Sequence, residues 1–168
     1  GKSTLVNLIP RFYDIESGQI LVDGVDVREM AQEDLRSKIG FVPQRAVLFS
    51  GSIGDNIRYG KEDATNEEMR YAADVAQATD FIENMPDGFN SEIAQGGTNV
   101  SGGQKQRLSI ARALVRKPEI YVFDDSFSAL DFKTDAKLRA ALKNETRDAT
   151  VFIVAQRVGT VMDADQII

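Results

Sequence analysis

The sequence predicts an α/β fold with a mostly parallel sheet and an α-helical insert. Apolar strand-like segments alternate with segments of helical periodicity, which is typical of parallel sheets, whose neighbouring strands need a crossover connection. One of these strands has the sequence Ile-Tyr-Val-Phe-Asp-Asp (residues 120–125), the pattern of a buried parallel strand that ends in carboxylates. These carboxylates are expected at the carboxyl edge of the sheet, where ligands of open α/β folds bind.

The N-terminal part predicts two helices and two strands. Apolar residues at helical spacing predict a first helix directly after Gly1: Leu5, Leu8, Ile9 and Phe12. Residues 12–24 are predicted as the end of this helix, a turn and a strand, with Asp23-Gly24 as a turn signal. A short helix over residues 32–38 and a buried strand over 39–43 follow.

The α-helical insert is predicted over residues 65–116. It opens with Thr65-x-x-Glu68, a capping-box pattern, and continues with apolar residues at helical spacing. The residue before a proline is disfavoured in a helix, so Lys117-Pro118 ends the insert. The pattern then predicts a strand over 119–124, a helix over 134–144 and a strand over 150–155.

Composition narrows the classes of function. A chain of 168 residues is long enough to bury one good core and is treated as one domain or a large part of one. The net charge is −6 and no dense cluster of Lys and Arg occurs, which disfavours nucleic-acid binding. No apolar run approaches the roughly 18 residues of a membrane span. Cys and His are both absent, which excludes disulfides, thiolate chemistry and imidazole ligands, and removes the commonest general acid/base.

Residues 1–4 match the end of the phosphate-loop pattern G-x-x-x-x-G-K-[ST]. In this pattern backbone N–H groups of Gly1 and Thr4 surround phosphate, Lys2 reaches the β and γ phosphates, and the Ser3 hydroxyl binds Mg2+. Four residues are a weak signal alone, but the predicted helix after them is the context that the motif requires. The chain begins within this pattern and has no initiator Met, so we expect a fragment of a longer polypeptide.

Two further segments suit phosphate and Mg2+. Ser101, Gly102, Gly103 and Gln104 open a predicted helix, whose exposed N–H groups and partial positive charge favour an anion. The alternative is a plain N-cap with two flexible glycines. Asp124, at the end of the apolar strand, is a candidate Mg2+ ligand, and the alternative is that the aspartates only cap the next segment.

Taken in order, these motifs resemble the ATP-binding domain of an ABC transporter, over essentially all 168 residues. The resemblance adds a Q-loop glutamine, Gln44, and a D-loop, Ser-Ala-Leu-Asp, that ends at Asp131. Three segments are similar to bacterial multidrug or lipid exporters: Arg-Phe-Tyr-Asp at 11–14, Gly-Gln-Ile-Leu-Val-Asp-Gly at 18–24 and Leu-Phe-Ser-Gly-Ser-Ile at 48–53.

The resemblance implies a P-loop NTPase core of the RecA type over 1–64 and 117–168, with a helical subdomain over 65–116 that carries the signature. It implies ATP and Mg2+ as cofactors, with Gln44 contacting Mg2+ and the attacking water. Two such domains dimerise head to tail in this family. The signature, Ser101 to Gln104, and Asp131 therefore act at a nucleotide held between the two domains. The remaining partner is a transmembrane domain, and the resemblance places this chain at the cytoplasmic face of the cell membrane.

Two positions depart from the family pattern. Asp125 stands where the family usually has the glutamate that orients or deprotonates the attacking water, and Gln156 replaces the switch histidine. Asp125 keeps a carboxylate that is one methylene shorter, while Gln156 can donate a hydrogen bond but cannot become cationic. Because the signature is intact, we expect a heterodimeric exporter in which this chain's own site is degenerate.

Three alternatives stay open. The first is a slow but working homodimer. The second is a non-transport ATPase of the same superfamily, which acts in DNA repair, chromosome organisation or at the ribosome. The third is that the isolated chain does not bind nucleotide, because half of the phosphate loop is missing.

Overall fold

The computed structural model describes residues 1–168, and its centre is a three-stranded parallel sheet. The strand order is β3 (Ile39–Val42), β6 (Ile120–Asp124) and β7 (Thr150–Val154). In the register, Ile39 and Thr150 both pair with Ile120. These are the three strands predicted at 39–43, 119–124 and 150–155, so the α/β class with a parallel sheet is confirmed.

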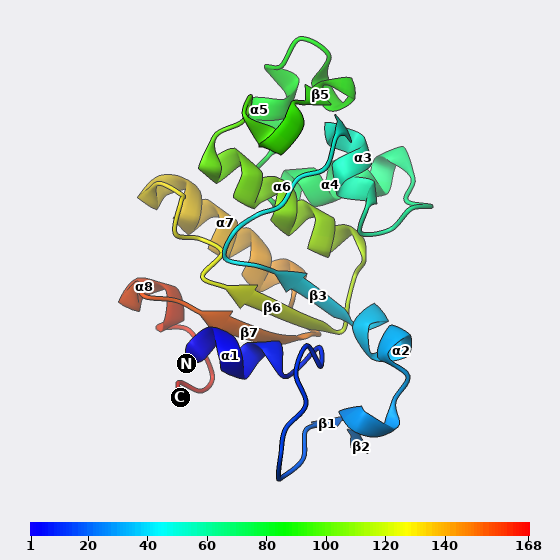
Figure 1. Cartoon of the computed structure of the whole chain (residues 1–168). Coiled ribbons are helices and arrows are strands. Elements are labelled where there is room, and N and C mark those ends of the chain that lie inside the picture. The colour runs from blue at the N-terminus through cyan, green and yellow to red at the C-terminus, as the bar shows by residue number, and fades with distance from the viewer.

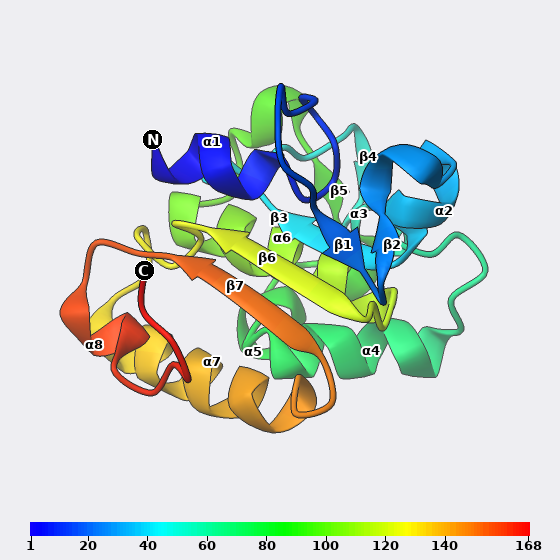
Figure 2. The ribbon, with the colours of Figure 1, turned by 90° about the horizontal axis from the view of Figure 1, so that it is seen from below.

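The middle strand β6 is buried on both faces. Tyr121 and Phe123 point into the larger of two apolar clusters, while Ile120 and Val122 point into the smaller one, as the period of two requires. Helices α6 (Gly102–Val115) and α7 (Phe132–Glu145) cover the first face. Helix α1 (Lys2–Asn7) lies on the other side of the sheet, next to β6 and β7 (Figures 1 and 2).

The helical part lies above the sheet in Figure 1 and consists of α3 (Ile53–Arg58), α4 (Asn66–Val75), α5 (Thr79–Glu83) and α6. The predicted capping box is present, because Thr65 Oγ1 accepts a hydrogen bond from the Glu68 N–H at 3.1 Å. Helix α3 was not predicted. It begins with a second capping box, Ser52-x-x-Asp55, and its buried Ile53 and Ile57 join the same core as α4 and α6.

The smaller elements complete the chain. Two antiparallel ribbons form outside the main sheet, β1 (Leu21–Val22) with β2 (Val25–Asp26) and β4 (Gly51–Ser52) with β5 (Glu92–Ile93). The other helices are α2 (Gln32–Ser37), α8 (Val158–Val161) and three short 3-10 turns, Val27–Glu29, Gln95–Gly97 and Gly88–Asn90.

Two predictions for the N-terminal segment need correction. The first helix ends at Asn7, before Phe12, because Pro10 disfavours a helical residue in front of it. The strand predicted within 12–24 does not join the parallel sheet. Asp23 and Gly24 have φ of 50° and 81°, the left-handed pair of a two-residue hairpin turn, and this turn folds β1 back on β2.

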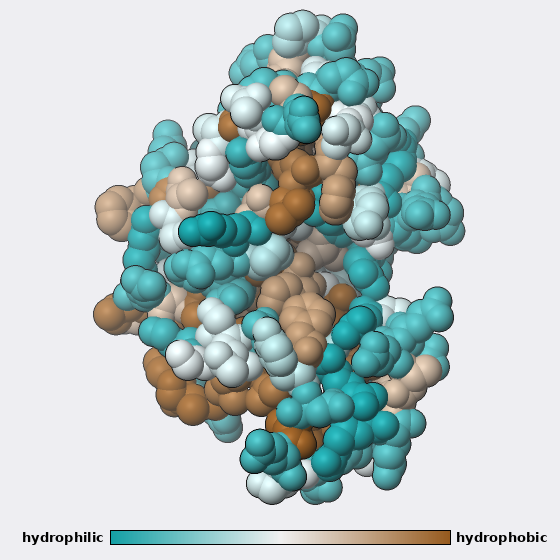
Figure 3. Space-filling view, viewed as in Figure 1, coloured by the Kyte–Doolittle hydropathy of each residue, from teal (hydrophilic) through white to brown (hydrophobic).

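Strand β7 lies at the edge of the sheet, and its side chains are only partly covered. Val151, Phe152 and Ile153 are 36% to 38% exposed, and Leu5 on the neighbouring helix α1 is 58% exposed. Figure 3 shows an apolar area in the lower left of the molecule, where Figure 1 has α1 and the C-terminus. None of the helices combines the length and the hydropathy that crossing a membrane would require.

Candidate functional site

An open cavity of about 160 Å3 lies at the carboxyl edge of the parallel sheet. Eight residues from four separate segments line it: Gly1, Lys2, Ser3, Gln44, Asp124, Asp125, Val154 and Gln156. They come from the start of α1 and from the ends of β3, β6 and β7 or the residues just beyond. Since parallel strands end at the same edge, the sheet topology brings these distant segments together.

Two hydrogen bonds organise the floor of the cavity. Ser3 Oγ donates to Asp124 Oδ1 at 3.0 Å, and Gln44 Nε2 donates to Asp125 Oδ2 at 3.2 Å. Asp124 is 6% exposed, whereas Gln44 lies at the surface. The first bond joins the predicted phosphate loop to the predicted Mg2+ ligand. The second joins two of the three predicted catalytic residues.

Asp125 has an unusual backbone. Its φ is 50°, in the left-handed region that aspartate tolerates better than most residues. Its N–H donates to Val154 O at 2.8 Å, which ties it to the end of β7. The backbone of Asp125 is therefore held between the ends of β6 and β7, and its side chain accepts the hydrogen bond from Gln44.

The residues that line the cavity are mostly polar, so the cavity suits a phosphate group better than an apolar ligand. Val154 is its only apolar residue, whereas pockets for drug-like ligands are mostly apolar. Lys2 is the only cation among the eight residues, and Asp124 and Asp125 are anions. A phosphate chain in this cavity therefore needs a further positive charge beside the carboxylates.

The donor set fits Mg2+ as that charge. A hydroxyl, a carboxylate and an amide oxygen, from Ser3, Asp124 and Gln44, are the hard oxygen ligands that Mg2+ prefers. The structure contains no cluster of three or more acidic or imidazole side chains that could bind a metal ion by themselves. Phosphate and water oxygens would therefore have to complete the coordination shell.

The remaining predicted site residues lie outside the cavity. Thr4 does not line it. Ser101 to Gln104 are at the N-terminus of α6, in the helical part and away from the start of α1 (Figure 1). Asp131 is the N-cap of α7 and accepts hydrogen bonds from the Thr134 N–H at 2.8 Å and the Thr134 hydroxyl at 2.9 Å. These bonds lower the pKa of Asp131 below its ordinary value.

The N-terminus of α6 is held by local contacts. Ser101 Oγ accepts from the Gln104 N–H at 3.1 Å, and Gln104 Oε1 accepts from the Ser101 N–H at 2.9 Å. This capping box corresponds to the N-cap alternative for Ser101. It leaves the N–H groups of Gly102 and Gly103 as the candidate anion donors. A Cβ at position 103 would lie 3.1 Å from Ala129 O, so the glycine allows the D-loop to approach α6 closely.

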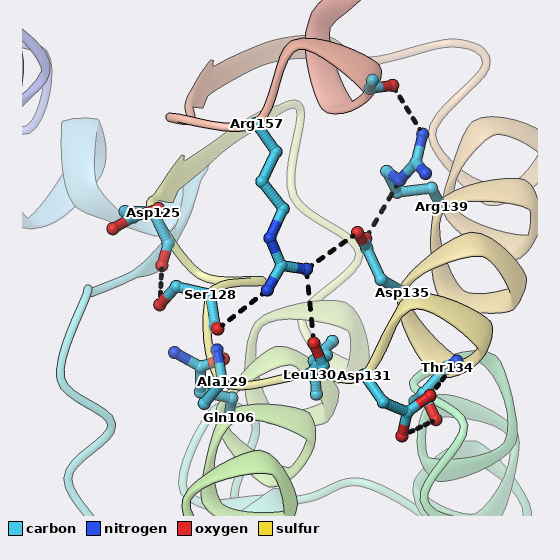
Figure 4. Close-up of polar contacts among 11 residues, drawn as sticks. Gln106, Asp125, Ser128, Ala129, Leu130, Asp131, Thr134, Asp135, Arg139 and Arg157 are labelled. Carbon is cyan, nitrogen blue, oxygen red and sulfur yellow. Dashed lines mark hydrogen bonds and ion pairs between the residues drawn. The ribbon is translucent and has the colours of Figure 1, made fainter.

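Two further residues, Gln106 and Arg157, connect these regions and are not predicted from the sequence. Gln106 is 5% exposed on α6, where its Nε2 donates to Gln44 O at 3.4 Å and its Oε1 accepts from the Ala129 N–H at 3.1 Å. The available signal was a polar side chain four residues before the buried Ile110, on the apolar face of the helix. Arg157 contacts the D-loop from the opposite side, and Figure 4 shows both residues around it.

Comparison with known proteins gives concordant matches. A family model described as "ABC transporter" matches residues 1–128. An ABC transporter ATP-binding protein of Mycobacterium tuberculosis is 54% identical over 171 residues, which cover 100% of this chain and 29% of the relative. A Staphylococcus aureus protein named for multidrug export, an ATP-binding/permease protein, is 47% identical over 168 residues, 100% of this chain and 29% of the relative.

The structure of a bacterial Atm1-family ABC exporter with ATP bound superimposes with a TM-score of 0.94 at 41% identity. The match covers 98% of this chain and 29% of that chain. The chain thus spans about 29% of the length of each of these relatives. The polar cavity, the parallel sheet and the helical part agree with these matches. The chain therefore belongs to the ABC transporter family, whose ATP-binding domains are ATPases, and it is an ATP-binding domain of the exporter type.

Proposed function

We propose that the chain is the nucleotide-binding domain of an ABC exporter and that it couples ATP binding and hydrolysis to transport of a substrate across a membrane. The observation that carries the proposal is the cavity at the carboxyl edge of the sheet, in which Lys2, Ser3, Gln44, Asp124 and Asp125 meet. We assign residues 1–64 and 117–168 to the nucleotide-binding core and residues 65–116 to the helical subdomain with the signature, with the difference that α3 (Ile53–Arg58) packs with the helical subdomain.

Each residue has a role in this proposal. The backbone of Gly1 to Thr4 and the Lys2 ammonium bind the phosphates. Ser3, Asp124 and Gln44 hold Mg2+, which neutralises charge on the phosphates during phosphoryl transfer. Asp125 and Gln44 face the attacking water, and Gln156 donates a hydrogen bond to the γ-phosphate.

We propose further that this chain's own site hydrolyses ATP weakly. The Asp125 carboxylate is one methylene shorter than glutamate, and one of its oxygens is already bonded to Gln44 at 3.2 Å. A misplacement of about 1 Å lowers a rate on the order of 100-fold. Gln156, the neighbouring polar group in the cavity, cannot carry a positive charge toward the γ-phosphate.

The signature gives the chain a second task. Ser101, Gly102, Gly103 and Gln104 retain the family pattern and complete the site of a partner ATP-binding domain, with Asp131 at the same interface. A heterodimer fits this division best, since a partner with a complete catalytic strand would hydrolyse at its own phosphate loop. A transmembrane domain is the third component, and this chain lies beside it at the cytoplasmic face of the membrane.

A slow homodimer is the second candidate, because Asp125 remains a carboxylate and lies in the cavity. A non-transport ATPase is disfavoured, because the compared relatives include a multidrug export protein and an exporter.

The deciding experiment is steady-state ATPase of the full-length transporter with its natural partner, comparing wild type with Asp125→Asn. This change removes a base while nearly keeping the shape of the side chain. We expect a loss of less than about threefold, because hydrolysis runs at the partner's site. A loss of about 100-fold, the size expected for a general base, would make this chain's own site catalytic and overturn the degenerate-site proposal. ATP titration of both proteins controls for lost binding.

A further inference from the structure

The D-loop, residues 128–131, connects β6 to α7 and is held by contacts on two sides (Figure 4). On one side Arg157 reaches across from the segment after β7. Its Nη2 donates to Ser128 O at 3.2 Å and its Nη1 donates to Leu130 O at 3.3 Å. One planar guanidinium therefore fixes two carbonyls of the same loop, a geometry that suits arginine and that a lysine ammonium does not reproduce.

The orientation of Arg157 is itself fixed. Its Nη1 lies 3.5 Å from Asp135 Oδ2, and its guanidinium lies 5.0 Å from the centre of the Phe132 ring. Asp135 is 2% exposed on α7 and has a second partner, Arg139, whose Nε donates to Oδ1 at 3.0 Å. Arg139 shares this buried carboxylate with Arg157 but makes no hydrogen bond to the D-loop.

On its other side the D-loop contacts the first turns of α6. The Ala129 N–H donates to Gln106 Oε1 at 3.1 Å. Ala129 O also lies close to Gly103, since a Cβ at position 103 would be only 3.1 Å from this oxygen. The D-loop thus lies between Arg157 and the helix end that carries the signature. Arg157 directly follows Gln156, which lines the nucleotide cavity.

We propose that Arg157 is a positioning residue that links the γ-phosphate contact at Gln156 to the signature, through the D-loop. This inference rests on the proposed function. When nucleotide holds Gln156, Arg157 holds the carbonyls of Ser128 and Leu130, and the loop supports the N-terminus of α6 at the partner's nucleotide. ATP bound at the weak site thereby sets the turnover rate of the partner's site.

The test is steady-state ATPase of the full-length transporter with its partner, for Arg157→Gln, Arg157→Lys and the matched control Arg139→Gln. Both Gln variants remove one cation from Asp135, but only the change at Arg157 frees the D-loop. Coupling of this kind is worth a factor of roughly 3 to 30, so we expect kcat to fall by that factor in both Arg157 variants. KM and ATP binding at this chain's own site should stay within about twofold of wild type, and Arg139→Gln should keep its kcat.

Three results would overturn the inference. Equal losses in Arg157→Gln and Arg139→Gln would indicate that only the charge pairing of Asp135 matters. A wild-type kcat in Arg157→Lys would exclude the two-carbonyl contact, and this variant decides the question if Arg157→Gln does not fold. A change confined to KM would indicate a binding role. Asp125→Asn, assayed in parallel, reports on the proposed function separately, since it asks which site hydrolyses.

Discussion

The nucleotide cavity and the N-terminus of α6 are built in different ways. The cavity collects residues from four segments that run from Gly1 to Gln156, and the contact between Ser3 and Asp124 joins positions 121 residues apart. The end of α6 is made of consecutive residues, with Ser101 and Gln104 closing their own capping box. Because Ser101 and Gln104 cap the helix by themselves, changes at Asp125 and Gln156 do not remove the capping box. This separation is what the proposed function requires, a weakened site of the chain's own and an intact contribution to another.

The two regions are nevertheless connected, through the D-loop and through Gln106. The D-loop contacts Arg157 on the side of the cavity and Gln106 on the side of α6. Gln106 also donates to Gln44 O, so a single buried amide joins the Q-loop and the D-loop. Experiments on each region separately test how far their independence extends.

The largest effect is expected at the phosphate contact. Lys2→Met removes the only cation of the cavity, and charge-assisted hydrogen bonds are worth about 1.5–3 kcal/mol, so ATP affinity at this site should fall on the order of 100-fold. The measurement is titration of Mg-ATP on the full-length protein. Lys38→Met, which removes a surface lysine paired with Glu119, is the control and should bind normally. If Lys2→Met bound Mg-ATP with wild-type affinity, the cavity would not be the nucleotide site.

A smaller effect, of opposite sign, is expected when the family residues are restored. The double variant Asp125→Glu with Gln156→His should raise hydrolysis by the protein without its partner about 10- to 100-fold. It should also add a step in the ATPase pH profile near the ordinary histidine pKa of about 6.5. The wild type, whose residues 1–168 contain no histidine, should lack a step from this position. If the rate of ATP hydrolysis did not rise, Asp125 and Gln156 would not be the residues that limit this rate.

The smallest effect separates capping from phosphate binding at α6. Ser101→Ala removes the N-cap and should lower the free energy of unfolding by about 0.5–2 kcal/mol, measured by urea denaturation. Ser101→Asp keeps a good N-cap but brings a negative charge to the proposed phosphate contact. It should therefore fold with wild-type stability and lose ATPase in the assembled transporter. Full ATPase in Ser101→Asp would leave Ser101 with a capping role alone.

Local patterns in the sequence were sufficient for much of the fold and for the candidate site. Apolar runs predicted β3, β6 and β7, and Thr65-x-x-Glu68 predicted the start of α4. Short motifs predict six of the residues that line the common cavity: Lys2, Ser3, Gln44, Asp124, Asp125 and Gln156. These features depend on neighbours in sequence or on short motifs, so they can be predicted without the tertiary structure.

Contacts between distant segments were decided only by the tertiary structure. The hairpin turn kept β1 out of the main sheet, and burial against α4 and α6 stabilised α3 beyond what its short length predicts. The left-handed backbone of Asp125 and the reach of Arg157 to the D-loop follow from how the ends of β6 and β7 lie side by side. Such geometry depends on residues far apart in the chain, and no local periodicity encodes it. The sequence alone therefore determined which groups line the candidate site, and the packing of the sheet and helices decided how they are connected.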